Sequence, residues 1–206
     1  MKNIILIFAL LPMLSIAQIS DKLFAEVSLG LVKDLKYTDK DINLFSPDMS
    51  SSRHQLEHGK ELSIGYQYSK KIALGVSYLD ARIYGSNDIE YFKGNFTDLS
   101  AFIQYDLYKI QNVILFATAA AGKTEYAASR FLVYDDTRLP INSPDGKANK
   151  KALGIGAKAD CKNNISIVAK YTVNEVDDDG FDGWDYGSNV DRYGFMSIGV
   201  RMNFNN

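Results

Sequence analysis

The chain has 206 residues, which suits one domain of ordinary size. Its 23 basic and 25 acidic side chains give a formal net charge of −2, so it lacks the basic field that a nucleic-acid-binding protein needs. The single cysteine, Cys161, excludes a small fold held together by internal disulfides.

The first 17 residues have the pattern of a cleavable signal peptide. Lys2 provides a positive start, residues 4–14 form a short apolar stretch, and Ser15-Ile16-Ala17 matches a small-x-small cleavage site. The apolar stretch is shorter than the ~20 residues that a membrane-spanning helix needs. We therefore expect residues 1–17 to be removed after export and residues 18–206 to form one mature domain.

Eight segments after the signal alternate between apolar and polar residues with a period of two, which is typical of β-strands with one apolar face. Each has roughly the ten residues that a tilted strand needs to cross a bilayer. One of them, 113–124, is apolar on both faces as far as Gly122, so its register cannot be read from the pattern. The predicted strands are 24–33, 61–68, 72–82, 97–107, 113–124, 151–160, 165–176 and 192–204.

The connections between these segments alternate in length. The short ones are 69–71, 108–112 and 161–164, and the long ones, rich in Asp, Asn, Ser, Gly and Pro, are 34–59, 83–96, 125–150 and 177–191. Short turns at one end and long loops at the other are typical of an up-and-down transmembrane barrel, with the turns in the periplasm and the loops outside the cell. We therefore predict an all-β, eight-stranded antiparallel transmembrane β-barrel.

The distribution of charge between the two strand faces separates a membrane barrel from a soluble one. A soluble barrel exposes many charges, at about 25–35% of its surface. Here the charges follow the small-residue face, and an ion that faced lipid would cost about 2–4 kcal/mol. We therefore predict that the apolar face contacts lipid and, as a hypothesis, that three acids and three bases form a charge network in the lumen. The members of this network are Glu26, Glu61, Asp106, Lys158, Lys170 and Arg201.

Together these features resemble the small eight-stranded outer-membrane β-barrels of the OmpA, OmpX and OmpW type, which are also called porin-like. The resemblance covers the whole mature chain and includes the signal sequence, the alternating segments, the rhythm of turns and loops, and the last strand, 193–204. It implies a location in the bacterial outer membrane, in contact with its lipid and lipopolysaccharide. It also implies that Phe204, the terminal aromatic residue, is a recognition signal for the barrel-assembly machinery.

Both histidines occur in the first long loop as His54-Gln-Leu-Glu57-His58, the H-x-x-E-H order of inverted zinc peptidases. Such a site needs a helix that places both imidazoles on one face, and a third ligand. A loop does not provide that helix. We interpret this stretch as a solvated loop, with adventitious metal binding and a peptidase site as the alternatives.

The last long loop begins with an acidic run. The opening ligand spacing of an EF-hand is matched by Glu175, Asp177, Asp179 and Gly180. The twelfth position, which needs a bidentate Glu, holds Tyr186. We interpret the run as a solvated acidic loop, with weak binding of a divalent cation, bridging lipopolysaccharide phosphates, as the alternative.

An eight-stranded barrel leaves an interior that side chains just fill, so any specific activity should lie in the outer loops. We expect a monomeric, non-enzymatic protein without cofactor, metal or nucleic-acid partner, in a structural or surface-interaction role. The alternative is a narrow porin-like channel for small solutes. A lipid A-modifying outer-membrane enzyme is less favoured, because its catalytic histidine would have to come from a loop. Cys161, in a predicted periplasmic turn without a paired His, is interpreted as an incidental thiol.

Overall fold

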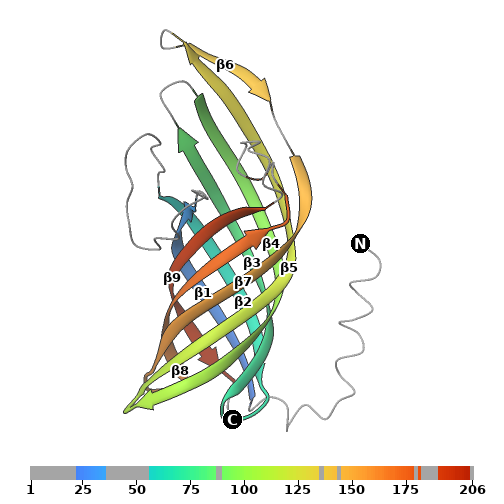
Figure 1. The fold of residues 1–206 in the computed structure, drawn as a ribbon. Helices are drawn as coiled ribbons and strands as arrows, with labels where there is room; N and C mark the ends of the chain where they lie inside the picture. Colours follow the sequence, from blue (N-terminus) through green and yellow to red (C-terminus); the bar gives the residue numbers. More distant parts are fainter. Residues whose placement is uncertain are drawn as a thin grey trace.

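The computed structural model describes residues 22–35, 56–86, 90–134, 137–142, 145–178, 181 and 190–204. These residues form nine antiparallel β-strands and the barrel drawn in Figure 1. The strands are β1 (Leu23–Asp34), β2 (Glu57–Gln67), β3 (Ile72–Ser86), β4 (Glu90–Ile110), β5 (Val113–Tyr134), β6 (Thr137–Asn142), β7 (Asp145–Asp160), β8 (Ile165–Val176) and β9 (Asp191–Asn203). The predicted signal peptide lies outside the described residues.

Eight of these strands close the barrel. Each pairs with its neighbour in the order β4-β3-β2-β1-β9-β8-β7-β5, and pairing of β4 with β5 joins the two ends of the sheet. The first and last strands also pair with each other, from Phe24 with Asn203 to Asp34 with Tyr193. The predicted eight-stranded antiparallel barrel is therefore confirmed. In a closed sheet the backbone groups of every strand find partners, which a bilayer requires.

Four strands are longer than predicted, namely β3, β4, β5 and β7. Residues 83–96 and 125–150 were expected to be loops, and this prediction is wrong: β3 continues to Ser86, β4 begins at Glu90, and β5 continues to Tyr134. The short strand β6 then pairs with the end of β5, and β7 begins at Asp145. These residues include many turn formers, but pairing with neighbouring strands and burial of Ile83, Phe92 and Phe96 keep them extended.

The other predictions of strand bounds agree to within a few residues, and 165–176 matches β8. The three short turns meet at the end where β1 begins and β9 ends (Figure 1). Gln111, Asn163 and Asn164 adopt positive φ angles of 53°, 60° and 61° in two of these turns. Asn tolerates this left-handed conformation better than most residues, which suits it to the turn before β8.

The apolar strand face points outward, as the lipid-facing interpretation requires. Leu62 is 48% exposed, Ile64 54%, Leu153 71% and Ile198 63%. No helix among the described residues is long and apolar enough to cross a membrane. An uncharged apolar belt of this kind would be unfavourable in water over so large a surface, and it matches the hydrocarbon of a bilayer.

Outward charges reappear above the belt, and four of them lie in one row of cross-strand neighbours. The row runs across five strands and consists of Lys60, Asp80, the uncharged Thr97, Glu125 and Lys147. The 22 residues of β5 span about 70 Å at ~3.3 Å per residue, far more than a ~30 Å hydrocarbon core needs. The upper parts of β3, β4 and β5, with β6, therefore stand above the membrane as an extension of one side of the barrel (Figure 1).

Aromatic rings that lie over glycines occupy much of the lower lumen. A Cβ atom on Gly65 would lie 2.2 Å from the ring of Phe24, and one on Gly156 would lie 2.4 Å from the ring of Phe116. Only glycine leaves room for a ring at such positions. Burial of Phe116 also fixes the register of β5, which the sequence left open: Phe116 points inward, whereas Leu115 is 41% exposed on the lipid side.

Candidate functional site

One cluster of buried charges centres on Glu26 of β1. Its Oε2 accepts hydrogen bonds from Arg201 Nε at 2.9 Å and Nη2 at 2.7 Å, and its Oε1 accepts one from Lys170 Nζ at 3.2 Å. Glu26 is 2% exposed and Arg201 3%. The Arg201 guanidinium also stacks on Phe24, 4.1 Å from the ring centroid. This centre joins three neighbouring strands, β1, β9 and β8, on the inner face of the barrel.

Lys170 and Arg201 connect this centre to further ion pairs and hydrogen bonds. Lys170 Nζ lies 2.6 Å from Glu61 Oε2, and Arg201 Nη2 donates to Gln104 Oε1 at 2.9 Å. Gln104 in turn donates to Asp106 Oδ1 at 2.8 Å, and Lys158 Nζ lies 3.8 Å from Asp106 Oδ2. The structure thus brings all six residues of the predicted lumen network together, with Gln104 as the connection that the sequence-based prediction lacked.

A second buried cluster, which was not predicted from the sequence, lies nearer the long-loop end. Asp98 of β4 accepts hydrogen bonds from Lys150 Nζ at 2.5 Å, from Thr124 Oγ1 at 2.6 Å and from the Tyr193 hydroxyl. Asp98 is 1% exposed and Tyr193 0%. Asp98 shares the inward face of β4 with Gln104 and Asp106, which is the signal that could have identified it. Lys150 gives no such signal, because the sequence predicts a loop over 125–150.

A cavity of about 50 Å³ lies between the two clusters, lined by Glu26, Glu61, Lys150, Lys170 and Arg201 among other residues. Such a volume has room for a few water molecules but not for a stream of hydrated solutes. Three cations and two acids surround it, and the cluster around Asp98 borders it through Lys150. The polar part of the lumen therefore contains a small charged chamber.

An apolar core fills the barrel mouth above Asp98. Phe181, from the segment between β8 and β9, is 1% exposed, and its ring centroid lies 5.0 Å from that of Phe96 and 5.6 Å from those of Tyr126 and Tyr193. Burial and a hydrogen bond to Asp178 raise the pKa of Tyr126 far above its usual value, so its hydroxyl stays neutral. The predicted solvated loop thus contributes a buried ring to the interior.

The extension above the membrane carries uncovered apolar side chains. Leu132 of β5 is paired with Leu139 of β6, and they are 37% and 48% exposed. Ile141 follows on β6 at 44% exposure. Leu132 is on the face of β5 that holds Tyr126 and Ala128 lower down, which is the lumen side. Pro140, also in β6, has no backbone N–H, which suits a strand at the edge of a sheet.

The remaining sequence motifs are only partly described. His54 and residues 179–180 and 182–189 of the acidic loop, which include Asp179, Gly180 and Tyr186, lie outside the described residues. Glu57 and His58 are the first two residues of β2, so they point to opposite faces of the sheet. Asp177 is exposed, 3.8 Å from Lys151. In the described part of the chain no three His, Cys, Asp or Glu residues are placed to hold a metal ion.

Cys161 and Phe204 both lie at the short-turn end of the barrel. Cys161 is exposed in the turn before β8, as predicted, and its Sγ contacts the carbonyl oxygen of Ala159 at 3.7 Å. Phe204 follows β9 directly, is 47% exposed, and its N–H donates to the carbonyl of Leu23 at 2.9 Å. Its role as an assembly signal stays a prediction.

Comparisons with known proteins agree on the fold. No family model and no curated protein matches the sequence. Among solved structures, Neisserial surface protein A is 17% identical, with a TM-score of 0.51 over 88% of this chain and 96% of that one. The outer membrane protease OmpT from Escherichia coli is 11% identical, with a TM-score of 0.50 over 89% and 97%. The chain therefore has the fold of the small outer-membrane β-barrels, which confirms at the level of the fold the resemblance seen in the sequence.

Proposed function

We propose that the chain is a monomeric, non-enzymatic protein of the bacterial outer membrane, exported with a cleavable signal, that contacts other molecules through its extracellular extension. The observation that carries this proposal is the contrast between the two parts of the molecule. In the part of the chain that the structure describes, packed rings and ion pairs leave a cavity of about 50 Å³ in the barrel interior, whereas the sheet of β3 to β6 above the membrane presents uncovered apolar side chains. Activity is therefore assigned to the outer surface and not to the lumen.

The packing of the lumen supports the part of the proposal that assigns no activity to the barrel interior. Solutes that enter from outside meet the packed rings of Phe96, Phe181 and Tyr193, and below them the ion pairs of Asp98 and Glu26. Displacing a buried ion requires breaking its pairs without water to replace them, which is costly. In planar bilayers the native protein is expected to give no conductance steps.

The extension above the membrane supports the part of the proposal that assigns contacts with other molecules to the outer surface. It is built from paired strands, so it holds its side chains in fixed positions, as rigid scaffolds of binding sites do. Leu132, Leu139 and Ile141 are exposed above the lipid belt, where burial against a partner would be favourable. We propose that the belt and the charged row above it contact outer-membrane lipid and lipopolysaccharide. The barrel-assembly machinery is proposed as the partner during biogenesis.

A hairpin deletion tests the surface role. Arg130 and Asn142 are cross-strand partners, so residues 131–141 can be replaced by Asn-Gly, a dipeptide that closes a two-residue hairpin. Bacteria that display the native chain are expected to adhere to protein-coated surfaces more than bacteria that display the shortened chain. A matched control keeps the hairpin and changes Lys147, below it, to Gln. Equal adhesion of native and shortened chains, at equal folded amounts, would refute the surface role.

The cavity favours one second candidate, a narrow channel for small solutes. It shows that the lower lumen is not completely packed, and a shift of Lys170 from one of its carboxylates to the other would change its shape. Reproducible conductance steps from the native protein would favour this channel and reject the closed barrel.

A further inference from the structure

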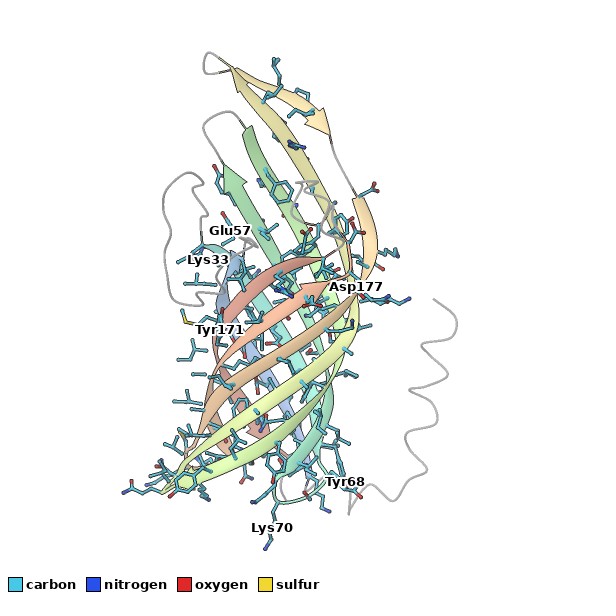
Figure 2. All side chains as sticks on the ribbon, viewed as in Figure 1. Lys33, Glu57, Tyr68, Lys70, Tyr171 and Asp177 are labelled. Carbon is cyan, nitrogen blue, oxygen red and sulfur yellow. The ribbon has the colours of Figure 1, made fainter. Side chains whose placement is uncertain are left out.

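Five exposed lysines surround the short-turn end of the barrel. Figure 2 shows Lys70 there, near Tyr68, at the opposite end from Lys33 and Asp177. The barrel topology brings them to one level, because β1 begins at this end and the three short turns lie there. We call the set the lysine rim: Lys22, Lys70, Lys71, Lys109 and Lys162, all of which are exposed.

Acidic side chains do not balance the lysine rim in the described part of this end. The two acids described there are Asp106, which is 8% exposed and paired with Lys158, and Asp160, which is half-buried and accepts a hydrogen bond from Ser166 at 2.9 Å. The whole chain has a formal net charge of −2, so this end is strongly positive on a mildly acidic protein. The positive field therefore faces out from the turns.

The rim lysines lie at the level of a lipid interface. Lys22 Nζ is 5.9 Å from the ring centroid of Tyr66, and Lys71 Nζ is 6.0 Å from that of Tyr105. Tyr105 is 45% exposed on the lipid-facing side, and Tyr108, next to Lys109, is 64% exposed. Tyrosines of this kind mark the headgroup region of a bilayer, and lysines beside them extend their ammonium groups into it.

We propose that the lysine rim binds the headgroup phosphates of anionic phospholipids in the leaflet that the short turns face. Contact of two of the ammonium groups with belt tyrosines favours lipid over the cell wall, because it holds the charge beside the bilayer rather than below it. Each lysine near an anionic membrane surface raises the association constant about fivefold, and salt screens this attraction. The proposal uses only the transmembrane barrel and depends on neither the closed lumen nor the extracellular surface.

The single cysteine offers a local readout, because Cys161 is exposed and next to Lys162. A fluorophore on Cys161 would report quenching by nitroxide-labelled phospholipid in phosphatidylcholine vesicles. Labelled phosphatidylglycerol is expected to associate at least fivefold more than labelled phosphatidylcholine at low salt. The preference should disappear in 0.5 M NaCl, where the screening length is about 4 Å.

Charge-matched variants locate the effect. Changing all five rim lysines to Gln is expected to abolish the preference for phosphatidylglycerol. Five substitutions to Gln at the other end should leave it unchanged, and these are at Lys33, Arg82, Lys93, Lys123 and Lys151, which are all exposed. The salt titration needs no variant, so the proposal can be tested even if the rim variant does not fold.

Equal quenching by the two lipids in the native protein would overturn the proposal. If purified cell-wall fragments then sediment the native protein but not the rim variant, the partner is the cell wall and not lipid. Conductance steps or unchanged adhesion would refute the proposed surface function without affecting the lipid preference, so the two failures can be told apart.

Discussion

The ion pairs inside the barrel predict a large loss of stability from a small change at Glu26. This carboxylate is 2% exposed and accepts three hydrogen bonds from Arg201 and Lys170. Glu26→Gln keeps the shape of the side chain and removes its charge. Lys170 keeps Glu61 at 2.6 Å, but Arg201 keeps only the neutral Gln104. A buried ion without its partner costs about 3–5 kcal/mol, and we expect a loss of that size in the free energy of unfolding.

The assay is a urea titration of the protein in lipid vesicles, read as the change in gel mobility between folded and unfolded barrel. Lys147→Gln is the matched control, because its pair with Glu125 has a similar distance, 2.6 Å, but its side chains are 70% and 59% exposed. The control should cost no more than about 1 kcal/mol. Replacing both Glu26 and Arg201 by Met removes the unpaired charge and should recover most of the loss.

A result in which Glu26→Gln costs no more than the Lys147→Gln control would refute this reasoning. It would mean that water reaches Glu26 and Arg201 and replaces the lost partner. The lumen would then be hydrated from one end, and the closed barrel of the proposed function would lose its main support.

Three further predictions use the same urea titration. Asp98→Asn leaves Lys150 without a carboxylate in the upper cluster and should cost about 3–5 kcal/mol. Gly65→Val would place a Cβ atom 2.2 Å from the Phe24 ring and should cost at least about 1–3 kcal/mol through overpacking. Leu153→Arg, in the lipid belt, should cost about 2–4 kcal/mol, whereas Leu139→Arg on the extension should change stability by less than about 0.5 kcal/mol. Equal costs at Leu153 and Leu139 would contradict the lipid-facing belt.

Strands could be predicted from the sequence where two different environments act on alternate residues. Within the membrane, lipid selects apolar residues such as Ile167 and Ala169 on one face of β8, and the lumen accepts Ser166 and Lys170 on the other, so the period of two is clear. Above the membrane, lipid no longer acts on the outer face. The segment 83–96 then looks like a loop, although its inward residues are still large and apolar.

The direction of the lumen charges could be predicted, but not their pairing. Alternation along each strand shows that Glu26, Lys170 and Arg201 share a face, because neighbouring residues are apolar. Which of them meet depends on strand register and on the order around the barrel, and a single strand carries neither. Lys170 pairs across the sheet with Ser197 and Gly156, and still its ammonium group reaches Glu26 and Glu61.

Tyr193 links the apolar mouth of the barrel to the polar cluster at Asp98 below it. Its ring packs on Phe96 at 4.9 Å and on Phe181, within the apolar mouth, while its hydroxyl donates to Asp98 in the polar part below. The apolar mouth keeps water from the outer side away from Asp98, and an ion pair is harder to break where water cannot replace a partner. The cluster at Asp98 in turn holds Tyr193 in place under Phe181. The aromatic mouth and the ion pairs therefore stabilise each other, and loss of either should open the barrel from the extracellular side.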